Sequence, residues 1–142
     1  MPNPQSVSEW LAVADRHAET ARTLLGAGQY DNGWFHAGLS VECTLKAAIM
    51  HTERLNRWPE RHERRELYTH VLHRLLDIAG VDLNQVISEP VAPALHVTLS
   101  WQRGEGYNPN AMPRKVASDM VEAATGINGV NRWIETRFRL PR

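Results

Sequence analysis

The segment from Tyr30 to Met50, YDNGWFHAGLSVECTLKAAIM, constrains the fold more than any other part of the chain. Its apolar and small residues recur every three or four positions, which is the spacing of one face of an α-helix. The short side chains within it would let a neighbouring helix approach closely. The pattern predicts a central helix whose buried stripe consists of Trp34, Gly38, Val41, Leu45 and Ile49, widened by Phe35 and Leu39.

Glu42 is the unexpected member of this helix, because its position falls between Phe35, Leu39 and the main stripe. A carboxylate among packed side chains requires a partner. Lys46 lies one turn further on, in the Glu-before-Lys order that favours an ion pair. The sequence therefore predicts a structural pair of Glu42 and Lys46, and the alternative is that the two residues contact a ligand.

Helical periodicity also appears on both sides of the central segment. The first helix is predicted to begin at Ser6, with Glu9 at the capping-box spacing, and to end at Gly26. Val91 to Trp101 fits a strand or a helix, and we expect a helix because no partner strand appears elsewhere. The other predicted helices are Tyr68 to Ala79, Leu83 to Ser88 capped by Asp82, and one continuous helix from Pro113 to Phe138.

The last predicted helix contains Gly126 and Gly129, each of which costs a helix up to about 1 kcal/mol relative to Ala. We therefore expect a close helix contact there, within the fold or across a dimer seam. The loop from Trp101 to Pro113 is rich in Gly, Asn and Pro and is long enough to be functional. Together these patterns predict a single all-α domain over residues 1–142, an antiparallel up-and-down bundle of four to five helices.

A polar connection, residues 53–66, separates the central helix from the third. It holds five arginines and four glutamates, so its net charge is only +1. We expect a solvated segment whose charges pair with one another rather than a basic patch.

Sixteen basic and sixteen acidic residues give the chain no net charge, so any contact with nucleic acid has to rest on local groups. The single cysteine, Cys43, suits a core position in a reducing cytoplasm. There is no secretory signal and no run of 18 apolar residues, so we expect a cytoplasmic protein that does not span a membrane. The chain lacks paired metal-ligand and phosphate-loop motifs, and we expect no metal and no cofactor.

Several short motifs occur in one order along the chain: Gly28-Gln29-Tyr30, Phe35-His36-Ala37, Glu42-x-x-Leu45-Lys46-Ala47, Thr69-His70-x-Leu72, and a Trp101 to Tyr107 loop. In this order and spacing the chain resembles the HEPN family, small prokaryotic helical domains, over nearly its whole length. The resemblance implies a helical bundle, usually a homodimer, with nucleotide or RNA binding at a cleft. It also implies a role as a toxin or phage-defence ribonuclease, often neutralised by a nucleotidyltransferase-type antitoxin.

Active ribonucleases of this family carry an arginine, four to six residues, and then a histidine. Arg65 and His70 fit this pattern, as do Arg64 with His70 and Arg57 with His62. The resemblance thus implies a metal-independent cleavage in which His70 is the base and Arg65, with Arg64 as the alternative, stabilises the phosphate charge. Catalytic members usually carry the motif near the start of a late helix, where this chain has Arg103 and Tyr107 but no histidine.

The remaining candidate residues would bind nucleotide or RNA: Arg103, Tyr107, Glu42, Lys46 and His73. On the predicted third helix His70 and His73 flank an inward stripe of Val71, Leu72, Leu75 and Leu76, near the helix N-terminus, a place that suits anions. The alternative for His70 is a structural hydrogen bond to Glu42. The alternative for the whole protein is a non-catalytic module that binds a partner protein, such as a nucleotidyltransferase, or a regulatory nucleotide; a third is a helical subunit of a larger complex.

Overall fold

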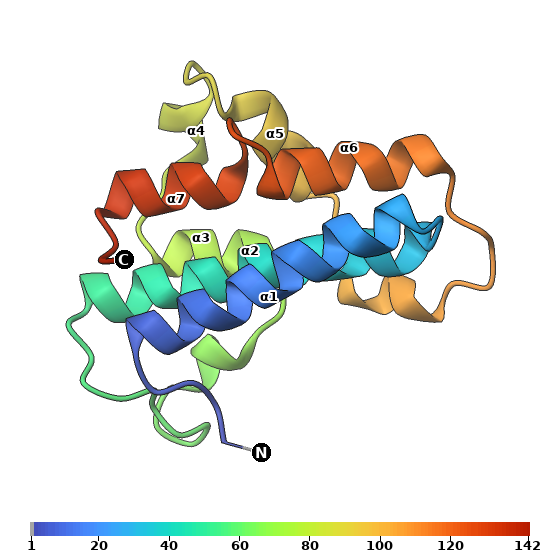
Figure 1. Cartoon of the computed structure of the whole chain (residues 1–142). Helices are drawn as coiled ribbons and strands as arrows, with labels where there is room; N and C mark the ends of the chain where they lie inside the picture. Colours follow the sequence, from blue (N-terminus) through green and yellow to red (C-terminus); the bar gives the residue numbers. More distant parts are fainter. Residues whose placement is uncertain (1) are drawn as a thin grey trace.

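A computed structural model describes residues 2–142, and all regular structure in this range is helical. The helices α1 (Val7–Gly26) and α2 (Tyr30–Thr52) form an antiparallel pair, and α6 (Arg114–Thr125) and α7 (Val130–Phe138) follow one another along another side of α2 (Figure 1). The prediction of an all-α bundle is confirmed. The shorter elements are the 3-10 helices η1 (Arg65–Tyr68) and η2 (Arg103–Tyr107) and the α-helices α3 (Leu72–Ile78), α4 (Leu83–Val86) and α5 (Ala92–Thr98).

The helix α2 lies at the centre of the molecule, as its sequence predicts. Every residue from Ser40 to Met50 is buried, and α2 contacts α1, α3, α6, α7 and η2. A helix buried on all sides is stabilised mainly by the removal of apolar surface from water, at about 25 cal/mol per Å². Because α2 is held from so many directions, it is a rigid base for the polar groups that it carries.

The first helix begins and ends as its capping residues predict. The Ser6 hydroxyl accepts a hydrogen bond from the Glu9 backbone N–H at 3.1 Å, and the Glu9 carboxylate accepts one from the Gln5 N–H at 2.8 Å. Gly28 has a φ of +80°, a value that suits glycine, in the short turn that reverses the chain into α2. This turn sets the antiparallel arrangement of α1 and α2.

The third helix is shorter than predicted and begins after His70. Thr69 to Val71 is extended, and the Thr69 hydroxyl accepts a hydrogen bond from the Val71 N–H at 3.1 Å, which stabilises a non-helical backbone. The prediction that His70 lies within the third helix is therefore wrong, because His70 comes two positions before the first residue of α3. Val71 is 48% exposed instead of facing inward. The predicted helices at residues 83–88 and 91–101 are confirmed as α4 and α5, and Asp82 caps α4.

The predicted continuous last helix is also wrong, because it is interrupted between α6 and α7. Gly126 and Gly129 have extended backbones, with ψ of 172° and 174°. A Cβ atom on Gly126 would stand 2.6 Å from the Glu122 carbonyl oxygen, and one on Gly129 would stand 2.9 Å from the Ala123 carbonyl oxygen. These glycines thus allow a tight turn against the end of α6, and within the chain the atoms nearest to an added Cβ belong to this turn and not to another helix. Contact across a dimer seam stays a prediction.

None of the helices within residues 2–142 combines the length and the apolar character that crossing a bilayer demands.

Candidate functional site

A carboxylate in the middle of α2 is the starting point of the site. Glu42 and Lys46 are each only 5% exposed, and the Lys46 Nζ lies 3.1 Å from Glu42 Oε2, as the sequence predicts. The same ammonium lies 5.4 Å and 5.9 Å from the ring centroids of Trp10 and Trp58, within cation–π range. Burial of both charges carries a desolvation penalty, which further hydrogen bonds to the carboxylate help to offset.

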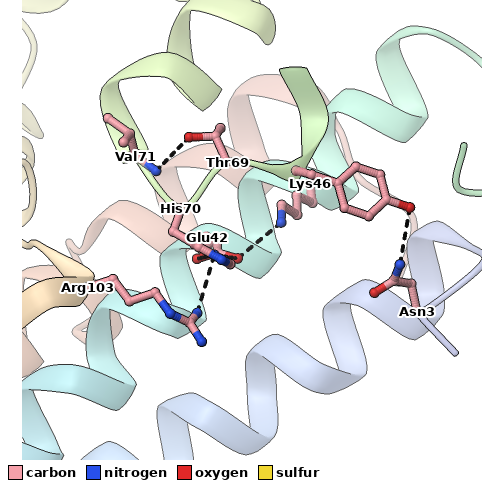
Figure 2. A network of polar contacts seen from close by, with 8 residues as sticks. Asn3, Glu42, Lys46, Thr69, His70, Val71 and Arg103 are labelled. Carbon is pink, nitrogen blue, oxygen red and sulfur yellow. Dashed lines mark hydrogen bonds and ion pairs between the residues drawn. The ribbon is translucent and has the colours of Figure 1, made fainter. Parts of the chain in front are cut away.

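His70 provides such a hydrogen bond from the extended segment before α3. Its Nδ1 lies 3.0 Å from Glu42 Oε1 and 3.1 Å from Glu42 Oε2, while the imidazole side chain is 44% exposed (Figure 2). An ionised carboxylate only accepts, so Nδ1 carries the hydrogen and donates it to Glu42. In the neutral ring Nε2 then keeps the free lone pair, which is the arrangement of a general base oriented by a carboxylate.

Arg103 reaches the same place from η2, far along the chain. Its Nη1 lies 3.3 Å from His70 Nδ1, and Figure 2 shows the guanidinium beside the pair of His70 and Glu42. Because Nδ1 donates to Glu42, it has no lone pair for Arg103, so the guanidinium keeps its donors for another acceptor. The cluster of Glu42, Lys46, His70 and Arg103, called the Glu42 cluster below, thus places a guanidinium beside a base.

The segment that carries Arg103 is fixed to α2 by Trp101. This indole is 4% exposed and lies directly on Gly38, where an added Cβ would stand 2.1 Å from the ring. The ring centroids of Trp34 and Phe35 lie 6.1 Å and 5.9 Å from that of Trp101. A glycine in the predicted apolar stripe of α2 therefore provides the space that brings η2 close to Glu42.

A cavity of about 330 Å³ opens on the η2 side of the cluster. Arg103 borders it together with Tyr107, a residue that is 91% exposed. The sequence pointed to both residues as ligand contacts, but it did not show that the start of α2 completes the wall. The other lining residues are Asp31, Asn32, Trp34, Phe35, Glu105 and Met112.

Arg64, one of the two predicted catalytic arginines, lies in the polar connection. It donates to Glu53 at 2.7 Å and to Glu66 at 2.8 Å. The hydrogen bond from Arg64 lowers the pKa of the Glu53 carboxyl, and the two carboxylates raise the pKa of the guanidinium. Arg57 forms a similar pair with Glu63, at 2.8 Å, and holds the pKa of Glu63 at about 2. The connection is self-paired, as predicted.

Arg65 and His73 also lie apart from the Glu42 cluster. Arg65 borders a different pocket, with Arg61, Tyr68 and Arg74 among its neighbours. His73 is on α3, where its Nε2 lies 3.8 Å from Asp77 Oδ2. Among the arginines of residues 2–142, Arg103 is the one within hydrogen-bond distance of His70.

A second histidine contact joins α1 to α2. His17 Nδ1 and His36 Nδ1 lie 3.0 Å apart, so one ring donates and the other accepts. Burial lowers the pKa of both rings, and the nearby His36 further lowers the pKa of His17. The two residues are 19 positions apart, and nothing in their sequence surroundings indicated the contact.

Cys43 is a buried thiol, and it lies outside any group of metal-ligand side chains in the described residues. Burial raises the pKa of the Cys43 thiol to about 12, so it is a core side chain, as predicted. The part of the chain that the structure describes contains no group of three or more His, Cys, Asp or Glu residues placed to hold a metal ion.

Comparison with known proteins gives one match. The family model described as HEPN domain matches residues 7–91, more than half of the chain. The matched range includes Glu42, Lys46 and His70, whereas Arg103 and the rest of η2 lie beyond it. No curated protein and no solved structure shows significant similarity to the chain.

Proposed function

We infer the function from one premise, that this chain belongs to the HEPN family, as the match over residues 7–91 shows. The HEPN domain indicates a function related to nucleotides or RNA in general. We propose that this protein binds RNA at the Glu42 cluster and cleaves it as a metal-independent ribonuclease. The observation that carries the proposal is the contact of a carboxylate-bound, partly exposed imidazole with a guanidinium, His70 Nδ1 to Arg103 Nη1 at 3.3 Å.

In the proposed reaction His70 acts on the ribose and Arg103 on the phosphate. Nε2 of His70 takes the proton of the 2′-hydroxyl, and the 2′-oxygen forms a bond to phosphorus while the bond from phosphorus to the 5′-oxygen breaks. Arg103 stabilises the negative charge that builds on the phosphate oxygens. The 5′-oxygen takes up a proton, so the products are a 2′,3′-cyclic phosphate and a 5′-hydroxyl.

Glu42 and Lys46 are positioning residues in this reaction. Glu42 holds the imidazole through Nδ1 and favours the cationic ring that forms when the base takes a proton. Lys46 holds the carboxylate in place at 3.1 Å. Because the pair is buried, it orients His70 without competing for the substrate.

The test is incubation of purified protein with RNA in EDTA, followed by analysis of the product ends. Wild-type protein should give cyclic phosphates, and His70→Ala should lower the rate at least about 100-fold, the usual contribution of a general base. His73→Ala is the matched control, because His73 is an exposed neighbour outside the cluster, and it should retain full activity. Intact RNA with wild-type protein would refute the ribonuclease proposal.

The choice of arginine is a separate test. Arg103→Ala should reduce cleavage strongly, whereas Arg65→Ala and Arg64→Ala should not, because these two guanidinium groups lie in other surroundings. If Arg65→Ala removes activity and Arg103→Ala does not, the assignment predicted from the family motif is correct and ours is wrong.

We also propose that the protein works as a cytoplasmic homodimer in a toxin-antitoxin or phage-defence system, with a nucleotidyltransferase-type protein as antitoxin. In such a dimer a second copy of the cluster would supply the proton for the 5′-oxygen. Light scattering of the purified protein should give twice the mass of one chain, and a mass of one chain would exclude the dimer at that concentration.

A non-catalytic interaction module is the second candidate, and two exposed apolar side chains favour it. Ile87 and Ile127 are each 77% exposed, so each offers an apolar contact to a protein partner. This candidate predicts that RNA survives equally with wild type and His70→Ala, and that Ile87→Ser and Ile127→Ser weaken binding of the protein partner.

A further inference from the structure

The cavity beside Arg103 has a chemical character different from that of a phosphate site. Asp31 and Glu105 place two carboxylates on its wall against the one guanidinium of Arg103. A phosphate that filled the cavity would be repelled by both carboxylates, so a phosphate belongs at the Glu42 cluster and not here. The cavity instead suits a neutral ligand that presents hydrogen-bond donors to a carboxylate.

The walls of the cavity also provide flat apolar surface. Phe35 is half-buried and is backed by Trp101, with ring centroids 5.9 Å apart, so its ring is held in place. Tyr107 stands almost fully exposed at the rim, with its ring available to a ligand. Aromatic rings of this kind bind single-stranded nucleic acid by stacking on its bases.

From this combination we propose that the cavity binds a guanine base, with Asp31 as the residue that selects it. Guanine alone among the four RNA bases has two adjacent donors, N1–H and the N2 amino group, on its Watson–Crick edge. A carboxylate can accept from both, whereas adenine, cytosine and uracil each place an acceptor beside their donor. Asp31 lies in the first turn of the rigid helix α2, while Glu105 already accepts a hydrogen bond from Asn108 at 2.9 Å.

The inference rests on the proposed function in that Arg103 borders both the cavity and the cluster. A guanine in the cavity would place its sugar and phosphate near Arg103 and hence near His70. The proposed ribonuclease would then act next to a guanosine. The same base could come from RNA or from a free guanine nucleotide, and the experiment separates the two sources.

Binding is measured with short 2′-O-methyl oligonucleotides, which lack the attacking hydroxyl and cannot be cleaved by the proposed reaction. The oligonucleotides differ at one position, which holds guanosine, inosine or adenosine, and fluorescence anisotropy gives the affinity of the full chain. Guanosine should bind about tenfold more tightly than adenosine, and inosine, which lacks the N2 amino group, should fall between them. Equal affinity for the three would overturn the proposal.

Two variants test the assigned residues. Asp31→Asn should bring the guanosine and adenosine affinities to within about twofold, while Asp119→Asn, an exposed carboxylate paired with Lys115 on α6, should leave the preference intact. Tyr107→Ala should weaken binding of every base at least about fivefold, and Tyr107→Phe should not. A preference that survives in Asp31→Asn would remove Asp31 from the site.

Competition and cleavage identify the source of the base. If guanosine monophosphate displaces the oligonucleotide at a concentration close to the oligonucleotide's own dissociation constant, and Asp31→Asn abolishes this, a free nucleotide is the ligand and the guanine site stands. Cleavage of unmodified RNA without preference for guanosine would overturn the guanine site and leave the ribonuclease. Guanine-selective binding without cleavage would support the guanine site and refute the ribonuclease.

Discussion

Two regions of this molecule use the same charged residue types in opposite ways. In the Glu42 cluster a carboxylate with 7% of its side chain exposed contacts Lys46 of α2 and His70 of the segment before α3, and Arg103 of η2 contacts His70. In the polar connection, residues 53–66, arginines and glutamates form hydrogen bonds with close neighbours near the surface. Both regions contain Arg, Glu and His, but the charged side chains of the first come from three segments of the chain, whereas those of the second come from one.

The difference shows what distinguishes a site from a solvated segment. It is the burial of the charged groups and their origin in separate segments of the chain, not the number of charges. A surface pair contributes about 0 to 1 kcal/mol and is screened by salt. A buried pair fixes geometry, because an unpaired charge in the interior is costly. The pairs that fit the family motif, an arginine, four to six residues and then a histidine, fall in or beside the polar connection. The arginine that contacts His70 instead lies 33 residues further along the chain, in η2.

The largest effect should come from removing the carboxylate at the centre of the cluster. Glu42→Leu leaves the Lys46 ammonium buried without an ion-pair partner, and we expect a loss of about 3 to 5 kcal/mol in the free energy of unfolding, measured by urea denaturation. The double variant Glu42→Leu with Lys46→Met should recover most of this loss, because an apolar pair replaces an ion pair. If the double variant is as unstable as the single one, the cost lies in packing and not in charge.

A smaller loss in the free energy of unfolding is expected when the space that the Trp101 indole occupies beside Gly38 is filled. Gly38→Ala places a methyl group where the indole lies, and the rearrangement should cost about 1 to 3 kcal/mol. Because Trp101 is two residues from Arg103, the same change should also reduce RNA binding. Gly104→Ala is the control, since a Cβ at Gly104 meets no atom within 4 Å, and unchanged stability in Gly38→Ala would contradict this account.

A third effect should appear only as the pH falls, and it separates buried from exposed titrating groups. The pKa values of His17 and His36 are lower in the fold than their ordinary value of 6.5, chiefly because of burial. Their contribution to stability is therefore complete above pH 6.5 and is lost as the pH falls through the lowered values. Urea midpoints should decrease from pH 7 to pH 5, and less so in a variant with Gln at both positions.

Glu53 and Glu63 of the polar connection should add nothing to that acid-dependent loss. The pKa values of Glu53 and Glu63 are lowered by Arg64 and Arg57, so both carboxylates stay ionised between pH 7 and pH 5. A variant with Gln at both positions should therefore show the same decrease with pH as wild type. A flatter curve in this variant would mean that Glu53 or Glu63 titrates in this range.

The smallest effect is expected from the surface pairs. Arg64→Ala removes contacts with Glu53 and Glu66, but all three side chains are about a third or more exposed, so the free energy of unfolding should change by no more than about 1 kcal/mol. The change should shrink further in 0.5 M salt. A loss as large as that of Glu42→Leu would end the distinction between the two regions.

Those features that depend on local periodicity could be predicted from the sequence. The central helix, the cap at Ser6 and the burial of Glu42 beside Lys46 follow from spacing along a helix, and the structure has all three. The start of α3 could not be placed because the Thr69 side chain competes with the helix for the Val71 N–H. The interruption at Gly126 to Gly129 was missed because the apolar spacing continues through it.

The long-range parts of the candidate site could not be predicted in this way. Arg103 lies in a loop without periodicity, so nothing local indicates that it reaches His70. Asp31 shares a stretch with Trp34 and Phe35, but only the packing of η2 on α2 turns these residues into a cavity wall. Gly38 belonged to the predicted stripe, yet its role is to make room for the Trp101 indole, which lies 63 positions further along the chain.

The central position of α2 has a consequence for how the site can vary. Asp31, Phe35, Gly38, Glu42 and Lys46 follow one another at intervals of three or four residues along this one helix. The helical rise, about 1.5 Å per residue, therefore sets the distance between the cavity and the His70 imidazole. Deletion or insertion of a single residue between Phe35 and Glu42 would rotate the cavity residues about the helix axis by about 100° relative to Glu42. Substitutions can change the cavity and the Glu42 cluster separately, but the number of residues between them has to stay constant.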